Sequence, residues 1–125
     1  MSEKKVEWNE ITGIPSTILE SLNRSLGQYI GRYKTVKVGI TGRDPQQRFN
    51  EHLKEIDWDR MVVIYESSSI NFCNEIEASL VANKFDCLSN KRAGGGSDLS
   101  EKGLNYVYVL LKGLKIKKFN GILNK

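Results

Sequence analysis

Three kinds of side chain along this sequence match the needs of phosphodiester hydrolysis. Arg48 carries a planar fork of donors that can neutralise charge on phosphoryl oxygens. Glu77 is a carboxylate that could hold a divalent metal beside the leaving oxygen. A tyrosine or lysine between residues 29 and 37 could accept the proton of the attacking water. Each also has an ordinary structural explanation, as a solvated helix residue, a surface carboxylate or an aromatic side chain at the edge of the core.

A predicted strand leads into the helix that carries Arg48. Apolar residues alternate with other residues over 35–41, which is typical of a half-buried strand. The face opposite the apolar residues carries Lys37, Gly39 and Thr41, and we take it as the candidate active face.

The helix is expected to begin after Asp44, with proline at its first position. Its apolar stripe is Phe49, Leu53 and Ile56. Arg48 and His52 lie four residues apart on a neighbouring face, so their side chains should meet.

Periodicity assigns the rest of the chain. We expect a loosely held arm over 1–9, a short helix from Pro15 that Gly27 closes, and a strand over 28–33 in a tight hairpin with strand 35–41. Further strands are predicted over 61–65 and 105–111. Between them, a helix begins near Ser69 or Asn71 and ends near Phe85, and a glycine-containing loop covers 88–97. On that helix Glu77 lies nearer the apolar stripe than Glu75, so it is the better candidate for a groove.

Composition limits the class of protein. A chain of 125 residues suits a single domain, 1–125, and its net charge of +4 favours an anionic partner. No apolar segment is long enough for a membrane span and the N-terminus does not resemble a signal peptide, so we expect a cytoplasmic protein without a membrane partner. With one histidine, and with Cys73 and Cys87 far apart, a structural zinc site is not expected.

The order of these motifs resembles the GIY-YIG endonuclease domain. Gly27-Gln28-Tyr29 stands in the place of the first motif, and Lys37-Val38-Gly39 in that of the second. Arg48 to His52 matches the helix with arginine and histidine, Glu75 to Ala78 the metal-binding helix, and Asn90 the asparagine, before a run of three glycines. The resemblance covers about 27–96, and it sets 1–26 apart as an N-terminal helix and arm and 97–125 as a C-terminal strand and basic tail.

The resemblance implies an α+β fold, in which helices flank a small three-stranded antiparallel central sheet and a C-terminal strand is added. It also implies a metal-dependent endonuclease that cleaves DNA with one Mg²⁺ or Mn²⁺. The implied metal ligand is Glu77, Arg48 stabilises phosphoryl charge, Asn90 orients the site, and Tyr29, with His52 or Lys37, positions or activates water. Gly39 leaves room for the phosphate, and the remaining phosphate or DNA contacts are Thr41, Lys91 and Arg92.

Two departures from the family pattern keep other functions open. Lys37 replaces the tyrosine of the second motif and Gln28 the isoleucine of the first, while Tyr33 is a rival to Tyr29. The chain could therefore be a nucleic-acid-binding protein without turnover. It could also be a protein-interaction or inhibitor module that docks through its lysine-rich tail, and either a monomer or a homodimer is compatible with the sequence.

Overall fold

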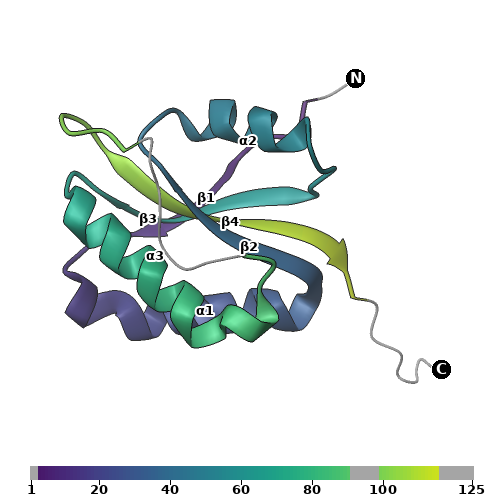
Figure 1. Cartoon of the computed structure of the whole chain (residues 1–125), viewed down its shortest axis with the longest axis horizontal. Coiled ribbons are helices and arrows are strands. Elements are labelled where there is room, and N and C mark those ends of the chain that lie inside the picture. Colours follow the sequence, from purple (N-terminus) through teal and green to yellow (C-terminus); the bar gives the residue numbers. More distant parts are fainter. Residues whose placement is uncertain (1–2, 91–98, 116–125) are drawn as a thin grey trace.

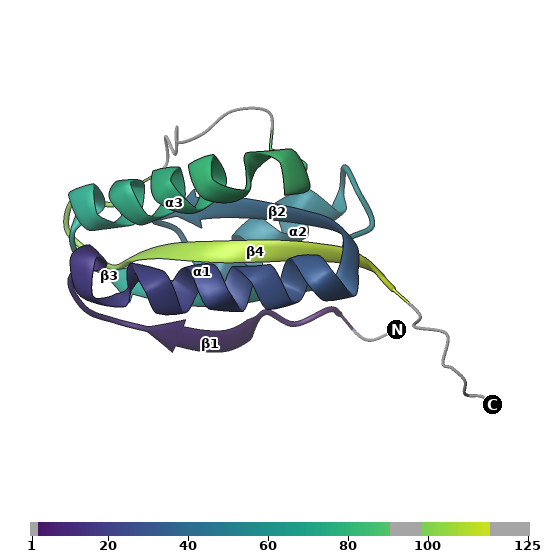
Figure 2. The same cartoon turned by 90° about the horizontal axis from the view of Figure 1, so that it is seen from below.

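A computed structural model describes residues 3–90 and 99–115 of the chain. Its elements in order are β1 (Glu7–Ile11), α1 (Pro15–Arg32), β2 (Tyr33–Thr41), α2 (Pro45–Leu53), β3 (Arg60–Ser67), α3 (Ile70–Lys84), a single 3₁₀ turn (Phe85–Cys87) and β4 (Asn105–Leu114). The four strands form one sheet, with α1 and α3 on one face and α2 on the other (Figures 1 and 2). The predicted α+β class is confirmed.

The sheet differs from the predicted one in size and in strand order. It has four strands in the order β1-β3-β4-β2. β4 is antiparallel to both of its neighbours, whereas β1 is parallel to β3, so the sheet is mixed. The expectation of a three-stranded antiparallel sheet was wrong, because the C-terminal strand lies inside the sheet and the N-terminal segment adds a parallel edge.

Most of the predicted strand over 28–33 is instead the last part of α1, which ends at Arg32, and Tyr33 is the first residue of β2. Leu22 and Leu26 are buried on this helix, and Ile30, a further four residues on, packs against the same core. This stripe continues past Gly27, whose presence within a helix costs about 1 kcal/mol relative to alanine. Burying one leucine is worth about 1.5–3 kcal/mol, so packing outweighs the glycine and the helix does not stop there.

The segment predicted as a loosely held arm contains β1. Glu7 and Trp8 pair with Val62 and Val63 of β3. Just before this strand, the backbone N–H of Val6 donates to Gln46 Oε1 at 2.9 Å, and Gln46 Nε2 donates to the Lys4 carbonyl at 2.9 Å. Sheet pairing and the side chain of Gln46 therefore fix residues 4–11.

Two clusters of buried side chains lie on opposite faces of the sheet. The cluster under α1 and α3 includes alternate residues of β2, β3 and β4, among them Val36, Val38, Ile40, Val107 and Val109. The cluster under α2 contains Phe49, Trp58, Met61, Val63, Tyr108 and Leu110. The side chains of β4 thus alternate between the two clusters, as expected for a strand that is buried on both faces.

The local predictions for the remaining elements agree with the structure. β2, β3 and β4 contain the predicted ranges, and α2 begins at Pro45 with Asp44 as its N-cap residue. Ser69 caps α3, because its Oγ accepts a hydrogen bond from the Phe72 backbone N–H at 3.0 Å. Ile56, predicted on the α2 stripe, lies beyond the helix end and is exposed. Within the described ranges, no helix has both the length and the apolar character to cross a membrane.

Candidate active site

The candidate site lies where α2 covers β2 and β4. Residues 36, 38 and 40 of β2 face the cluster under α1 and α3, so by alternation Lys37, Gly39 and Thr41 lie on the opposite face, as predicted. The structure shows that α2 covers this face. Lys37 is half-buried and pairs in register with Leu110, whereas Thr41 is fully buried. The Thr41 hydroxyl oxygen accepts a hydrogen bond from the Arg43 backbone N–H at 3.1 Å, which shapes the turn into α2.

A tyrosine of β4 lies across Gly39. Gly39 and Tyr108 are register partners in the antiparallel pairing of β2 with β4. A Cβ added at Gly39 would collide with the outer ring atoms and the hydroxyl of Tyr108. The room that the glycine leaves is therefore filled by the Tyr108 ring, contrary to the expectation that a phosphate would use it.

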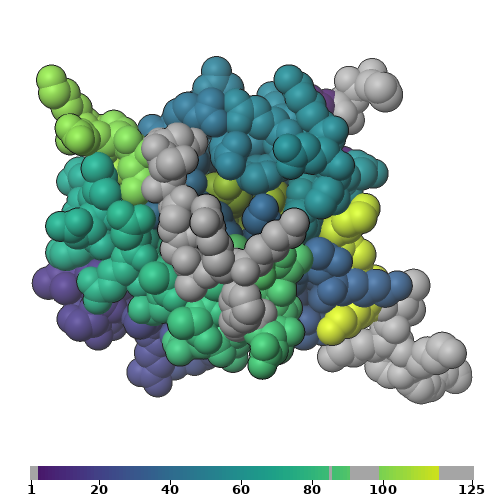
Figure 3. Space-filling view, viewed as in Figure 1, coloured from purple at the N-terminus to yellow at the C-terminus, as the bar shows by residue number. Residues whose placement is uncertain are grey.

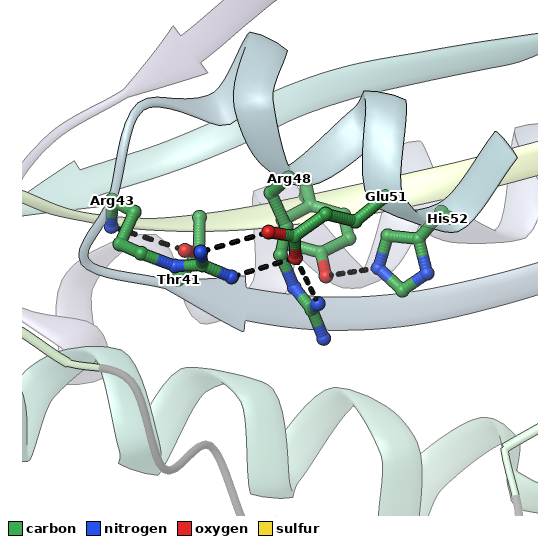
Figure 4. Close-up of polar contacts among 6 residues, drawn as sticks. Thr41, Arg43, Arg48, Glu51 and His52 are labelled. Atoms are coloured by element: carbon green, nitrogen blue, oxygen red, sulfur yellow. Dashed lines mark hydrogen bonds and ion pairs between the residues drawn. The ribbon is translucent and has the colours of Figure 1, made fainter. Parts of the chain in front are cut away.

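Tyr108 is paired with the single histidine of the chain. The Tyr108 hydroxyl oxygen and His52 Nε2 are 2.8 Å apart, and the two rings meet edge to face with centroids 5.7 Å apart (Figure 4). The tyrosine is 2% exposed and the histidine 7%, so little water surrounds the pair. When the Nε2 atom lacks a proton, the hydroxyl donates to it, and the protonated Nε2 donates to the oxygen in the other tautomer.

Next to this pair, two arginines hold one carboxylate. Glu51 Oε1 accepts hydrogen bonds from Arg43 Nη2 at 2.7 Å and from Arg48 Nη1 at 2.9 Å, and Oε2 accepts one from Arg43 Nη1 at 2.9 Å. The hydrogen bonds from Arg43 and then Arg48 lower the pKa of Glu51 to about 2. In Figure 4 the Arg48 guanidinium extends from α2 across β2 toward the side on which α3 lies.

Glu77 of α3 is a buried carboxylate on the face of the sheet opposite to His52 and Tyr108. It is 4% exposed, whereas Glu75 is exposed, as the helical wheel predicted. Its Oε1 atom is buried and has no hydrogen-bond partner among residues 3–90 and 99–115. Burial raises the pKa of Glu77 to about 7. A hard oxygen ligand without a donor beside it is the kind of group that a divalent cation binds.

Asn90 is joined to the outer edge of β2. Its Oδ1 accepts a hydrogen bond from the Val38 N–H at 2.9 Å, and its Nδ2 donates to the Val38 carbonyl at 2.8 Å. The Ser89 backbone N–H donates to the Val36 carbonyl at 2.8 Å. These bonds fix the edge of the strand next to Gly39, so Asn90 positions the backbone of the candidate site.

The tyrosine predicted for the site lies elsewhere. Tyr29 belongs to α1 and packs against the cluster under α1 and α3, on the opposite face of the sheet from His52 and Tyr108. Its rival Tyr33 uses its hydroxyl to accept a hydrogen bond from Arg60 at 2.8 Å. Tyr29 does not join the arginine and histidine of α2, because the segment predicted as its strand is a helix, and the Tyr33 hydroxyl is bound to Arg60 instead.

Sequence reasoning missed Tyr108, Arg43 and Glu51. The spacing of Arg48 and Glu51, three residues apart on one helix, was a readable sign of an ion pair. No comparable pattern in the sequence of β2 or β4 indicates that the two strands pair, so the position of Tyr108 opposite Gly39 could not be predicted. The predicted contacts Lys91 and Arg92 lie outside the described residues.

The surface between the two helices is hollowed. Figure 3 shows this hollow between α2 and α3, with atoms of β2 and β4 visible inside it. In the part of the chain that the structure describes, no three His, Cys, Asp or Glu side chains cluster as a metal site. Among the residues predicted for the site, Glu77 is the carboxylate that could hold a cation, with water or substrate oxygens as the other ligands. Comparison with models of protein families, with curated proteins and with solved structures finds no match to this chain.

Proposed function

We propose that this chain is a metal-dependent endonuclease that hydrolyses phosphodiester bonds of DNA in the cytoplasm. The observation that carries the proposal is the contact of the Tyr108 hydroxyl with His52, one helical turn from Arg48 and directly over Gly39. A proton acceptor and a cation thus lie together on the face of β2 that the resemblance to the GIY-YIG family assigns to catalysis.

The strand arrangement supports the same proposal. The resemblance expects a tyrosine-bearing strand antiparallel to the strand of Gly39. β4 lies in that place, although it comes later in the chain than the expected strand. We therefore assign to Tyr108 the role that the sequence resemblance gave to Tyr29.

The Tyr108–His52 pair provides a route for a proton. With Nε2 of His52 unprotonated, the Tyr108 hydroxyl can pass its proton to the imidazole and take one from the attacking water. The partly exposed Arg48 guanidinium stabilises the charge that grows on the phosphoryl oxygens. Arg48 and His52 lie on α2 and Tyr108 lies on β4, so regular secondary structure fixes the backbone positions of all three residues.

Glu77 is the residue that would hold the divalent ion. Its buried oxygen accepts no hydrogen bond from the described residues and so suits a hard cation. Mg²⁺ often binds to one or two carboxylates and keeps several waters, so one carboxylate suffices as the protein ligand. When bound, the ion would supply charge stabilisation at the leaving oxygen.

Two observations favour a DNA-binding protein without turnover as the second candidate. Lys37 stands where the family has a tyrosine, and Tyr108, which contacts His52, is almost entirely buried. A substrate water must reach the Tyr108 oxygen, and a site that stays closed would bind nucleic acid without cleaving it.

Nicking of supercoiled plasmid with Mg²⁺, Mn²⁺ or EDTA tests the proposal. We expect metal-dependent nicking that Glu77→Ala abolishes and that Tyr108→Phe reduces about 100-fold, because a general base contributes about 10²–10⁴ in rate. Tyr29→Phe is the matched control and should leave the rate unchanged. No cleavage by the folded wild type, together with salt-sensitive DNA binding, would establish the second candidate instead. If Tyr29→Phe were the damaging change, the assignment of Tyr108 would be wrong.

A further inference from the structure

The carboxylate of Glu51 is bound in the way that arginines bind a phosphate. One oxygen, Oε1, accepts hydrogen bonds from both Arg43 and Arg48, and Arg43 is bidentate through its second nitrogen. Two guanidinium groups around one anionic oxygen, with planar forks of donors, are the usual recognition of a phosphate in proteins.

We propose that Glu51 occupies this arginine pair in place of a phosphate group, and that a backbone phosphate of the bound nucleic acid displaces it. The inference rests on the proposed function and deepens it: it makes Arg43 a second phosphate-binding residue and Glu51 an internal competitor of the substrate. Binding of DNA then includes an exchange of one anion for another.

The pair is accessible and lies beside the reacting groups. The side chains of Arg43, Arg48 and Glu51 are 42%, 32% and 39% exposed, so a phosphate can approach from solvent. Glu51 directly precedes His52 in α2, and Figure 4 shows the three charged side chains beside His52, whose Nε2 contacts the Tyr108 hydroxyl. A phosphate held by these arginines would thus be adjacent to the proposed proton acceptor.

The exchange depends on the competing anion. With a pKa of about 2, Glu51 stays charged across the pH range in which proteins fold, and the arginines stay charged as well. Because Glu51 is attached to the same helix as Arg48, its effective concentration at the pair is high. A single phosphate therefore competes poorly, whereas a polymer that makes several phosphate contacts at once competes well.

The test measures binding of a fluorescent duplex oligonucleotide in EDTA, where no metal-dependent cleavage interferes. We expect Glu51→Gln to bind at least about threefold more tightly than wild type, because the competitor loses its charge. Glu7→Gln is the matched control: it removes the same charge from a bidentate pair with Arg60 on the β1 edge, and its affinity should stay within about 1.5-fold of wild type.

A double-mutant cycle identifies the arginine. Removal of Arg43 alone should weaken binding, and the gain from Glu51→Gln should be smaller in an Arg43→Gln background, where only the Arg48 contact is left to release. Unchanged or weaker binding by the folded Glu51→Gln variant would overturn the inference, because Glu51 would then only orient the arginines.

Two further results separate this inference from the proposed function. Tighter binding by Glu51→Gln without any plasmid nicking would leave the anion exchange standing and refute the endonuclease. Nicking by wild type together with weakened DNA binding by Glu51→Gln would support the endonuclease and refute the anion exchange. Titration with inorganic phosphate measures anion binding at the arginine pair without DNA. Binding of phosphate by the Glu51→Gln protein but not by wild type would support the exchange even if DNA did not bind.

Discussion

Replacing Glu77 by glutamine should change how the stability of this protein depends on pH. Glu77→Gln keeps the shape of the buried side chain and removes its charge. The carboxyl of Glu77 has a pKa of about 7 in the folded chain, against 4.5 as its ordinary value. The folded state thus binds its proton more tightly than the unfolded state does, and stability falls as pH rises between these two values.

The size of the effect follows from the two pKa values. A difference of about 2.5 units, at 1.36 kcal/mol per unit, gives on the order of 3 kcal/mol. This stabilisation is fully present below pH 4.5 and is lost once the pH exceeds about 7. The glutamine variant has no such loss, so the free energy of unfolding of Glu77→Gln minus that of wild type should rise by about 3 kcal/mol from pH 4.5 to pH 8.

The assay is urea unfolding in EDTA at several pH values. The difference between variant and wild type cancels the titration of the other groups. Glu75→Gln is the control on the same helix; its side chain is exposed, and its difference from wild type should vary by less than about 0.5 kcal/mol. If the Glu77→Gln difference were equally flat, Glu77 would have a stabilising partner when charged, and our interpretation of it as an empty carboxylate ligand would be wrong.

The same measurement with Mg²⁺ or Mn²⁺ at pH 8 reports metal binding without using activity. A ligand at ten times its dissociation constant stabilises the folded state by about 1.4 kcal/mol. We expect this gain for wild type and none for Glu77→Gln. Equal stabilisation of both proteins would place the ion elsewhere.

Two other changes test how the site is built. Gly39→Ala should push the Tyr108 ring from its place, costing about 1–3 kcal/mol in urea unfolding and at least tenfold in nicking rate. Gly31→Ala in α1 is its control, since an added Cβ there meets nothing within 4 Å and should stabilise the helix by about 0.5–1 kcal/mol; equal effects would refute the packing argument. Asn90→Ala removes both bonds to Val38, so we expect a loss of about 1–3 kcal/mol and faster hydrogen exchange at the Val38 amide. Unchanged exchange there would show that Asn90 does not hold the strand.

The side-chain positions that the sequence predicted correctly are those that depend on one local pattern. Alternation in residues 35–41 was enough to assign Gly39 and Lys37 to the face opposite the valines. The helical wheel was enough to distinguish Glu77 from Glu75. Such inferences need no knowledge of which elements become neighbours.

The secondary-structure prediction was wrong where the same residues fit both the two-residue period of a strand and the 3.6-residue period of a helix. In residues 28–33, tyrosine and glycine alternate as in a strand, whereas Leu22, Leu26 and Ile30 continue a helical stripe. Tertiary packing decided for the helix, because α1 buries its leucines under the sheet. This one misassignment also removed the predicted hairpin and carried Tyr29 away from the site.

The position of Tyr108 was beyond the reach of local patterns. The sequence predicted the strand that carries it, but strand pairing between β4 and β2 joins residues about 70 positions apart. Nothing in the composition of either strand states its partner. The resemblance to the GIY-YIG domain covers residues 27–96, whereas Tyr108, the tyrosine next to His52, lies beyond that range.

The central position of β4 has a consequence for protein synthesis. Ribosomes deliver β2 and β3 first, yet these strands pair with each other only through β4, which is translated after both. A nascent chain that ends before residue 105 therefore has an open gap in its sheet and no Tyr108 beside His52. If the protein cuts DNA, incomplete translation products cannot do so, because they lack Tyr108, the proposed proton acceptor. The last strand completes both the sheet and the site.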